Sequence, residues 1–223
     1  MKKFLLKIVL LFFGLSIGWV VLLRFVPVYF TPLMLVRAVE AWHESRPAHF
    51  DRTWVPIEQM SPQIVRAVIA SEDDLFLQHN GFVWEHIREA YASNQQGGRL
   101  RGGSSISQQT AKNVFTFGSR TYFRKAVEGY FTVLIELFWG KRRILEVYLN
   151  VVEWGDGIYG IEATANRYFG ISAVRLSANQ SALLAAALPS PRKYSVTNPS
   201  PYMRRRQAQI LWMMGNLPAK LEL

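Results

Sequence analysis

Three consecutive acidic residues, Glu72, Asp73 and Asp74, stand in the segment ASEDDLFLQHNG, residues 70–81. One interpretation makes Ser71 the N-cap of a helix whose first turn carries the carboxylates, where the helix dipole stabilises anions. In the other, the preceding helix runs through Ser71 and the carboxylates lie at its C-terminal end, where each is disfavoured by about 0.3–1 kcal/mol. A local rule broken in this way is typical of a functional site. Residue chemistry alone leaves both interpretations open.

A second candidate is GGSSISQQTAKN, residues 102–113. Its two glycines let the backbone approach a ligand, and Ser104 or Ser105 can cap the helix that follows. The free N–H groups at such a helix start form an anion site. Gln108 and Lys112 stand four positions apart, so an amide and an ammonium can reach the same ligand. A capped surface helix after a flexible loop explains the same residues without a ligand.

A third candidate lies in RTYFRKAVEGYF, residues 120–131, where Arg124 and Lys125 stand four and three positions before Glu128. Ion pairs at these spacings contribute only about 0.2–0.5 kcal/mol on a solvated helix, so this segment alone predicts no site. Together, however, the three segments offer two separated glutamates among several cations. A carboxylate base beside cations that bind phosphate, here called the cationic clamp, can catalyse the displacement of a pyrophosphate from a sugar carbon. The residues of this hypothesis are Glu72, Glu128, Lys112, Arg120, Arg124 and Lys125.

The elements that must position these residues are expected to be helices. SPQIVRAVIAS begins with Ser61 as N-cap and Pro62 at the first helical position, followed by an apolar face. Residues 121–152 predict two helices broken near Gly140, and three further helices are expected between residues 157 and 217. Strand-like alternation is almost absent. The pattern predicts a mainly α fold without a second extracytoplasmic domain.

The N-terminus predicts a membrane anchor. If Phe4 to Leu23 is helical it reaches about 30 Å, one hydrocarbon thickness, with Lys7 snorkelling. A cleavable signal peptide is the alternative, but no small-x-small site closes the apolar run, and the run is long for such a peptide. Lys2 and Lys3, with Lys7, favour a cytoplasmic tail by the positive-inside rule. We therefore expect a tail and anchor in residues 1–30 and one extracytoplasmic domain in residues 31–223.

Composition narrows the class of partner. The chain of 223 residues has no cysteine and a formal net charge of +10; with the three lysines of the tail set aside, 23 cations face 16 acids, a charge of +7. Beside a membrane this excess favours anionic lipid head groups. No finger, helix-turn-helix spacing or RNA-binding motif is present, so no nucleic-acid partner is expected.

Several motifs resemble known sites and fail on context. GDGIYG, residues 155–160, has the glycine spacing of a dinucleotide loop but no acid about 20 residues on, so it predicts a turn. GGRLRGGS places Gly103 where a P-loop needs lysine. SPRK, residues 190–193, lacks the companion motifs of a β-lactamase, and no H-E-x-x-H zinc helix occurs.

The candidate segments also resemble a family. EDDLFLQHNG, GGSSISQQTAKN, RKAVE and RILEVYLN occur in the order and roughly the spacing of the peptidoglycan glycosyltransferases of family 51, and QSALLAAALPSPRKY resembles their closing segment. The resemblance covers residues 60–195 and is closest to the monofunctional form, since no transpeptidase domain follows. It implies a lysozyme-like α fold with a hydrophobic membrane-facing region. It further implies polymerisation of lipid II on the outer face of the inner membrane.

The resemblance assigns roles residue by residue. Glu72 matches the general base that deprotonates the acceptor 4-hydroxyl, and Glu128 matches a second catalytic glutamate that organises cations or a divalent metal around the donor pyrophosphate. Ser105 stands where the family usually has threonine, which keeps the hydroxyl. The resemblance implies phosphate contacts for Lys112, Arg120, Arg124 and Lys125. It implies that the substrate-binding cleft is shaped by Ser104, Gln108, Gln109 and Asn113. It implies a structural role for Asp73, Phe76, His79 and Gly81.

The resemblance also implies partners and competing functions. The expected partners are lipid II, the growing glycan chain and membrane lipids, with other cell-wall synthesis or division proteins as candidates. No cofactor is obligatory, while Mg²⁺ or Mn²⁺ at the donor pyrophosphate, with Glu128 as its ligand, is allowed. A lysozyme-like glycosidase is the alternative enzyme, but it needs a general acid and has no use for a cationic clamp. A non-catalytic anchor that binds anionic lipid is the third hypothesis.

Overall fold

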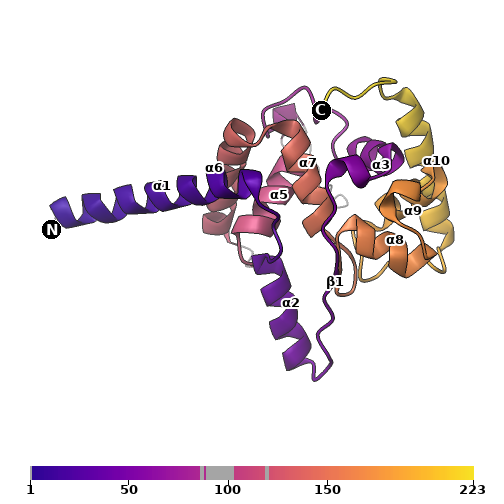
Figure 1. The fold of residues 1–223 in the computed structure, drawn as a ribbon, viewed down its shortest axis with the longest axis horizontal. Coiled ribbons are helices and arrows are strands. Elements are labelled where there is room, and N and C mark those ends of the chain that lie inside the picture. Colours follow the sequence, from indigo (N-terminus) through magenta and orange to yellow (C-terminus); the bar gives the residue numbers. More distant parts are fainter. Residues whose placement is uncertain (1, 86–87, 89–102, 119–120) are drawn as a thin grey trace.

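The computed structural model describes residues 2–85, 88, 103–118 and 121–223. Within these ranges the chain is mainly helical, with three two- or three-residue strands, which confirms the predicted fold class (Figure 1). Helix α1, Lys2–Phe25, projects away from the rest of the molecule. Its most apolar 18-residue window has a mean hydropathy of 2.4 and is only 11% buried, so α1 is long and apolar enough to cross a membrane, as predicted.

Helix α1 docks on the remaining helices through its last turns and a few hydrogen bonds. The Ser16 hydroxyl lies 2.7 Å from the Tyr130 hydroxyl. The Trp139 indole N–H donates to the backbone carbonyl of Val20 at 2.7 Å. Because these contacts lie on one side of α1, the opposite side stays free to face lipid.

Helix α3, Pro62–Glu72, begins as predicted, with Ser61 as N-cap and proline at its first position. It runs through Ser71 and ends at Glu72, with Asp73 as C-cap. Ser71 therefore does not cap a helix start, and the interpretation that placed the acids in a first turn is wrong. The carboxylates follow the C-terminal end of a helix, the arrangement that costs free energy and points to a site.

Helices α5, α6 and α7 form the next layer. Ser105 is the N-cap of α5 and forms a reciprocal capping box with Gln108. Gly140, at φ +72°, marks the break between α6 and α7 near the predicted residue. The three helices pack on one another, α5 against both of the others. Their bounds are Ile106–Phe115 for α5, Tyr122–Phe138 for α6 and Gly140–Val151 for α7.

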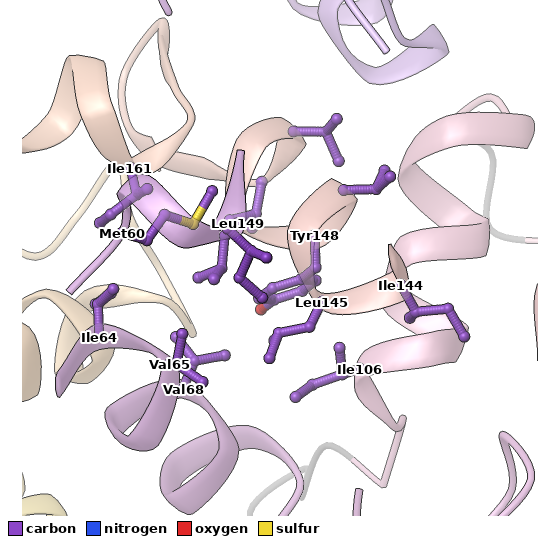
Figure 2. Close-up of a cluster of buried hydrophobic side chains, with 14 of the residues drawn as sticks. Met60, Ile64, Val65, Val68, Ile106, Ile144, Leu145, Tyr148, Leu149 and Ile161 are labelled. Atoms are coloured by element: carbon purple, nitrogen blue, oxygen red, sulfur yellow. The ribbon is translucent and has the colours of Figure 1, made fainter. Parts of the chain in front are cut away.

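The hydrophobic core joins α3, α5 and α7. Figure 2 shows Ile64 and Val68 of α3, Ile106 of α5, and Leu145 and Tyr148 of α7 converging on one another. All five side chains are fully buried. Burial of a large apolar side chain contributes about 1.5–3 kcal/mol, so this cluster holds the three helices that carry the candidate site residues at fixed separations.

The remaining elements cover α3 and close the fold. Helix α9 packs on α3 through small residues, Ala67 and Ala70 against Ala182, Ala185 and Ala186, which let the two helices approach closely. Helix α10 packs on both through the larger Ile210 and Met214. The short strands form one sheet in the order β1-β3-β2, and the GDGIYG segment makes the turn between β2 and β3, as predicted. The bounds are Pro32–His43 for α2, Asp51–Arg52 for β1, Glu153–Gly155 for β2, Ile158–Tyr159 for β3, Ile161–Phe169 for α8, Ala178–Ala187 for α9 and Pro201–Asn216 for α10, with 3-10 turns at Ile57–Gln59 and Ala173–Arg175.

Candidate active site

Glu72, the last residue of α3, is half-buried and held by a glutamine of α5. The Gln109 Nε2 donates to Glu72 Oε2 at 2.9 Å. The same amide is oriented by Tyr148, whose hydroxyl donates to Gln109 Oε1 at 3.3 Å, and by the Ser104 carbonyl, which accepts from Nε2 at 3.3 Å. Because Oε1 is the only acceptor of a glutamine amide, the Tyr148 contact turns its N–H groups toward Glu72. Gln109 therefore fixes one oxygen of the candidate base.

The environment of Glu72 makes it a stronger base than an ordinary glutamate. Burial raises the pKa of the Glu72 carboxyl, and the negative charge of Asp73 raises it further. The Gln109 hydrogen bond and the positive charges of Arg206 and Lys112 lower the pKa, without cancelling the effect of burial. A base with a raised pKa binds a proton more strongly, which suits a carboxylate that must deprotonate a hydroxyl group.

Asp73, beside Glu72, has a different role. Its buried carboxylate accepts a hydrogen bond from the Ile106 backbone N–H at the start of α5, at 2.9 Å from Oδ2. Both of its oxygens also lie within 3.0 Å of His79 Nε2. The His79 Nδ1 accepts from the Gly81 N–H at 2.9 Å, so the proton of the neutral ring is on Nε2 and points at Asp73. Asp73 thus ties the end of α3 to the start of α5 and to the segment between them.

Gly81 and Phe76 complete this connection. The Gly81 carbonyl accepts from the Ser105 hydroxyl at 2.6 Å. Gly81 has φ +89°, and a Cβ added there would lie 2.7 Å from a methyl group of Thr132, so only glycine fits. Phe76 is fully buried, with the Lys141 ammonium 4.6 Å from its ring centroid. The geometry of Asp73, Phe76, His79 and Gly81 is therefore that of a scaffold around Glu72.

A group of cations surrounds Glu128, which is 2% exposed. Arg124 Nη1 lies 2.6 Å from Glu128 Oε2, and Lys125 Nζ pairs with Oε1. Lys112 of α5 is exposed to solvent, yet the same charges act on it: desolvation by the nearby protein lowers the pKa of its ammonium, Glu128 and Glu72 raise this pKa, and Arg124 and Lys125 lower it. Lys112 therefore lies within electrostatic reach of both glutamates and joins the two halves of the candidate site.

Other predicted residues are placed differently. Gln108 is 3% exposed and its Oε1 accepts from the Ser105 N–H at 3.1 Å, so its amide caps α5 and turns inward, away from the position that a shared ligand with Lys112 requires. Asn113 is buried. Ser104 contributes the carbonyl that orients Gln109. Arg120 lies outside the described residues.

Two residues near Glu72 were not predicted from the residues themselves. Arg206 of α10 donates from Nη2 to the Ser71 carbonyl at 3.3 Å, and its charge lowers the pKa of Glu72. Tyr148 orients Gln109, and burial with the charges of Glu72 and Asp73 raises the pKa of its phenol well above the usual value. Tyr148 belongs to RILEVYLN, one of the motifs that carry the family resemblance, so the sequence pointed to its segment. Arg206 stands 134 residues after Glu72, and no local sequence pattern connects residues so far apart.

Glu128 does not fit as a metal ligand in this arrangement. Each of its oxygens is taken by a cation, Arg124 or Lys125. In the part of the chain that the structure describes, no group of three or more His, Asp or Glu side chains is close enough to hold an ion. A divalent ion brought by the pyrophosphate itself stays a prediction, since Mg²⁺ can rely mainly on substrate phosphates.

The first prediction concerns the Asp73 connection. Asp73→Asn replaces one acceptor oxygen by an N–H group, so either the Ile106 N–H or the His79 Nε2–H loses its partner. We expect the free energy of unfolding to fall by about 1–3 kcal/mol, measured by urea denaturation in detergent. Asp74→Asn, at the exposed neighbouring acid, is the matched control and should stay within about 0.5 kcal/mol of the unmodified chain. Equal stability of the two variants would contradict the bridging role.

Comparison with known proteins identifies the family of the chain. The transglycosylase family model matches residues 40–215. A biosynthetic peptidoglycan transglycosylase of Caulobacter vibrioides is 52% identical over 191 residues, 86% of this chain and 81% of the relative. Proteins of the same name from Bdellovibrio bacteriovorus and Bacteroides thetaiotaomicron are 46% and 47% identical over 95% of this chain, covering 84% and 86% of their own lengths. The chain belongs to the transglycosylase family.

Proposed function

We propose that this protein polymerises lipid II into linear peptidoglycan glycan chains, with Glu72 as the general base. The observation that carries the proposal is the pairing of two features in one site: a half-buried glutamate held by Gln109, and a cationic group around Glu128 linked to it through Lys112. Family membership and the printed name of the relatives support the same activity. No transpeptidase domain is detected in the 223 residues.

The reaction is a displacement at a sugar carbon. Glu72 takes the proton of the 4-hydroxyl group of N-acetylglucosamine on the acceptor lipid II, and that oxygen forms a bond to the anomeric carbon of the terminal N-acetylmuramic acid of the growing chain. The bond from this carbon to the pyrophosphate oxygen breaks, its electron pair leaves with undecaprenyl pyrophosphate, and the configuration inverts. A positioned base typically supplies about 10²–10⁴ in rate.

The cations act on the leaving group. Negative charge accumulates on the pyrophosphate oxygen as the bond breaks, and we infer that Lys112, Arg124 and Lys125 stabilise it. Glu128 holds Arg124 and Lys125 in place by its two ion pairs. Pyrophosphate is a stable anion, so the step needs no strong general acid.

The ion pairs of Glu128 also separate this function from a glycosidase. A glycosidase must protonate the sugar leaving group with a carboxylic acid. Both carboxylate oxygens of Glu128 are held by ion pairs with Arg124 and Lys125, so neither is free to deliver a proton to a sugar oxygen. The glycan polymerase is therefore the better fit. A non-catalytic lipid anchor, in turn, has no need of a half-buried glutamate held by Gln109.

We infer that the protein is anchored in the inner membrane by α1, with its N-terminus in the cytoplasm. The cations near the start of α1, Lys2, Lys3 and Lys7, support this orientation. Residues 1–30 then form the tail and anchor, and residues 31–223 the extracytoplasmic domain. Exposed apolar side chains on α2 and around the start of α6 support a second contact with the membrane: Leu35, Val39, Trp42, Phe117, Tyr122 and Phe123. Cell-wall synthesis or division proteins stay predicted partners.

The assignment of the base is tested by Glu72→Gln, which keeps the size of the side chain and removes its basicity. We expect the rate of lipid II polymerisation by the detergent-solubilised protein to fall about 10²–10⁴-fold, followed as glycan polymer on gels. Asp74→Asn removes a carboxylate two positions away and should leave the rate within about twofold. Undiminished polymer formation by Glu72→Gln would exclude Glu72 as the base.

The cationic clamp is tested by Lys112→Ala. Loss of a charge-assisted hydrogen bond to the donor pyrophosphate should lower kcat/KM for the donor about 10- to 100-fold while the far-ultraviolet circular dichroism stays unchanged. Lys220→Ala, at an exposed lysine of the C-terminal segment, is the control for a loss of charge. If both variants keep the kinetics of the unmodified chain, Lys112 does not contact the donor.

The hydrogen bond from Gln109 generates a pH prediction. Activity needs the ionised form of Glu72, so the rate rises with pH through the Glu72 pKa. Gln109→Leu removes a contact that lowers this pKa, so the acidic limb of the pH–rate profile should move to higher pH. Gln78→Leu, at an exposed glutamine, should leave the limb in place. A limb that stays in place or moves to lower pH in Gln109→Leu would contradict the contact.

A further inference from the structure

A cavity of about 350 Å³ lies where the chain leaves α1, and none of its lining residues belongs to the candidate active site. Its walls come from the segment after α1, from α2, from β1 and the two residues that follow it, and from α7. They are Val28, Tyr29, Met34, Arg52, Thr53, Trp54 and Asn150.

Arg52 gives this cavity its chemistry. Its guanidinium carbon lies 4.1 Å from the centroid of the Phe30 ring and 5.4 Å from that of the Tyr29 ring. The Nη1 group is buried without a hydrogen-bond partner, and Arg52 forms no ion pair with any residue that the structure describes. A buried charged donor without a partner destabilises the protein, so a ligand that accepts a hydrogen bond from Arg52 gains affinity by relieving that cost.

The surrounding charges leave Arg52 uncompensated. No carboxylate is among the residues that line the cavity. Asp51 is exposed, and the alternation of β1 directs its side chain to the face opposite Arg52. Glu146, the carboxylate of α7, is paired with Arg143, whose guanidinium lies 5.2 Å from the centroid of the Trp54 ring. The cavity is therefore positive and suits an anion.

The polar side chains that line the cavity differ in whether the protein already provides their hydrogen-bond partners. Asn150 is used within the protein, because its Oδ1 accepts from the Val55 N–H at 3.0 Å and its Nδ2 donates to the Val55 carbonyl at 2.9 Å. Thr53 is exposed. The guanidinium of Arg52 is a free donor of the wall, and its fork of N–H groups matches the oxygens of a phosphate group.

The position of the cavity indicates where that phosphate comes from. Val28 and Tyr29 follow the last residue of α1, Phe25, by three and four positions. Arg143 fixes the chain there by donating to the carbonyls of Leu23, at 2.8 Å, and Val26. If α1 spans the membrane, these residues lie at the level of the lipid head groups, where tyrosine and tryptophan are enriched.

The rim can also accept acyl chains. Phe25 and Phe30 are each 74% exposed, and Tyr29 is 53% exposed. The Tyr29 ring lines the cavity, the Phe30 ring lies against the Arg52 guanidinium, and Phe25 ends α1. Exposed aromatic surface next to a phosphate site can contact the acyl chains of a bound phospholipid.

We propose that this cavity binds the phosphate of an anionic phospholipid. The proposal rests on α1 spanning a membrane and not on glycosyl transfer, so a binding measurement tests it without reference to activity. The bound lipid holds β1 and the chain segment that follows α1 at the membrane surface. This lipid site is separate from the site at which lipid II reacts.

The test uses the full chain in an uncharged detergent, mixed with phosphatidylglycerol or phosphatidylcholine and examined by native mass spectrometry. We expect phosphatidylglycerol to be retained in preference to phosphatidylcholine, and Arg52→Gln to weaken its retention about tenfold, the usual effect of losing one charge-assisted hydrogen bond. Arg24→Gln removes the same charge at the same membrane level but outside the cavity, and should retain the lipid. Circular dichroism checks that each variant is folded.

A second variant keeps Arg52 and so covers a failure of Arg52→Gln to fold. Thr53→Glu places a carboxylate in the cavity wall, where it pairs with Arg52 and excludes the lipid phosphate; Gln59→Glu adds the same charge at an exposed position outside the cavity and should retain the lipid. Equal retention of the two lipids, or equal losses in a variant and its control, would overturn the proposal. Displacement of phosphatidylglycerol by millimolar glycerol phosphate would overturn the lipid assignment in favour of a soluble phosphate.

Discussion

The arrangement of the candidate site depends on one buried carboxylate. The Asp73 carboxylate accepts one hydrogen bond from the Ile106 N–H, the first of α5, and another from His79 Nε2. These bonds hold the end of α3 and the start of α5 at a fixed distance. A buried carboxylate is unfavourable unless its oxygens are satisfied, and the N-terminus of a helix is where backbone N–H groups and the helix dipole do so. Because its two partners come from α5 and from the segment between α3 and α5, neither can move without leaving Asp73 partly unsatisfied.

This constraint explains why three adjacent acids have three different environments. Glu72 is the last residue of α3 and lies over α5, where Gln109 binds it. Asp73, as C-cap, adopts φ −166° and ψ 77°, which turns its side chain into the protein. Asp74 is exposed. Since the same connection positions α5, it also fixes Lys112, and through Lys112 the electrostatic link between Glu72 and the cations around Glu128. The contact between α3 and α5 thus places the base and Lys112, and α6, which packs on α5, adds the cations around Glu128.

Sequence alone predicted the helical fold, the N-terminal membrane-length helix, the start of α3 at Ser61 and Pro62, and the break at Gly140, because each depends on residues close together in the chain. It left the role of Ser71 open, since a serine before three acids is compatible with a cap and with a helix end. It could not separate Gln108 from Gln109. The capping box turns Gln108 inward and leaves Gln109 facing Glu72. Which glutamine faces Glu72 depends on which serine is the N-cap, because the N-cap sets where the helix begins.

The rest of the site depends on contacts that no local pattern contains. Tyr148 reaches Gln109 from α7, and Arg206 reaches the end of α3 from α10, both through the packing of the core and of α3, α9 and α10 on one another. The roles of Glu72 and Glu128 came from the resemblance to a family. The residue chemistry alone gave only a pair of carboxylates among cations.

The central claim is that Asp73 acts on catalysis by positioning α5, and so Gln109, against Glu72. A double-mutant cycle of Asp73→Asn and Gln109→Leu, with the rate of lipid II polymerisation measured for all four proteins in the folded state, tests it most directly. If Asp73 acts in this way, the two changes disrupt the same contact. The polymerisation rate of the double variant should then be about equal to that of the slower single variant, with a coupling energy above about 1 kcal/mol. Losses that multiply, so that the coupling is close to zero, would contradict it.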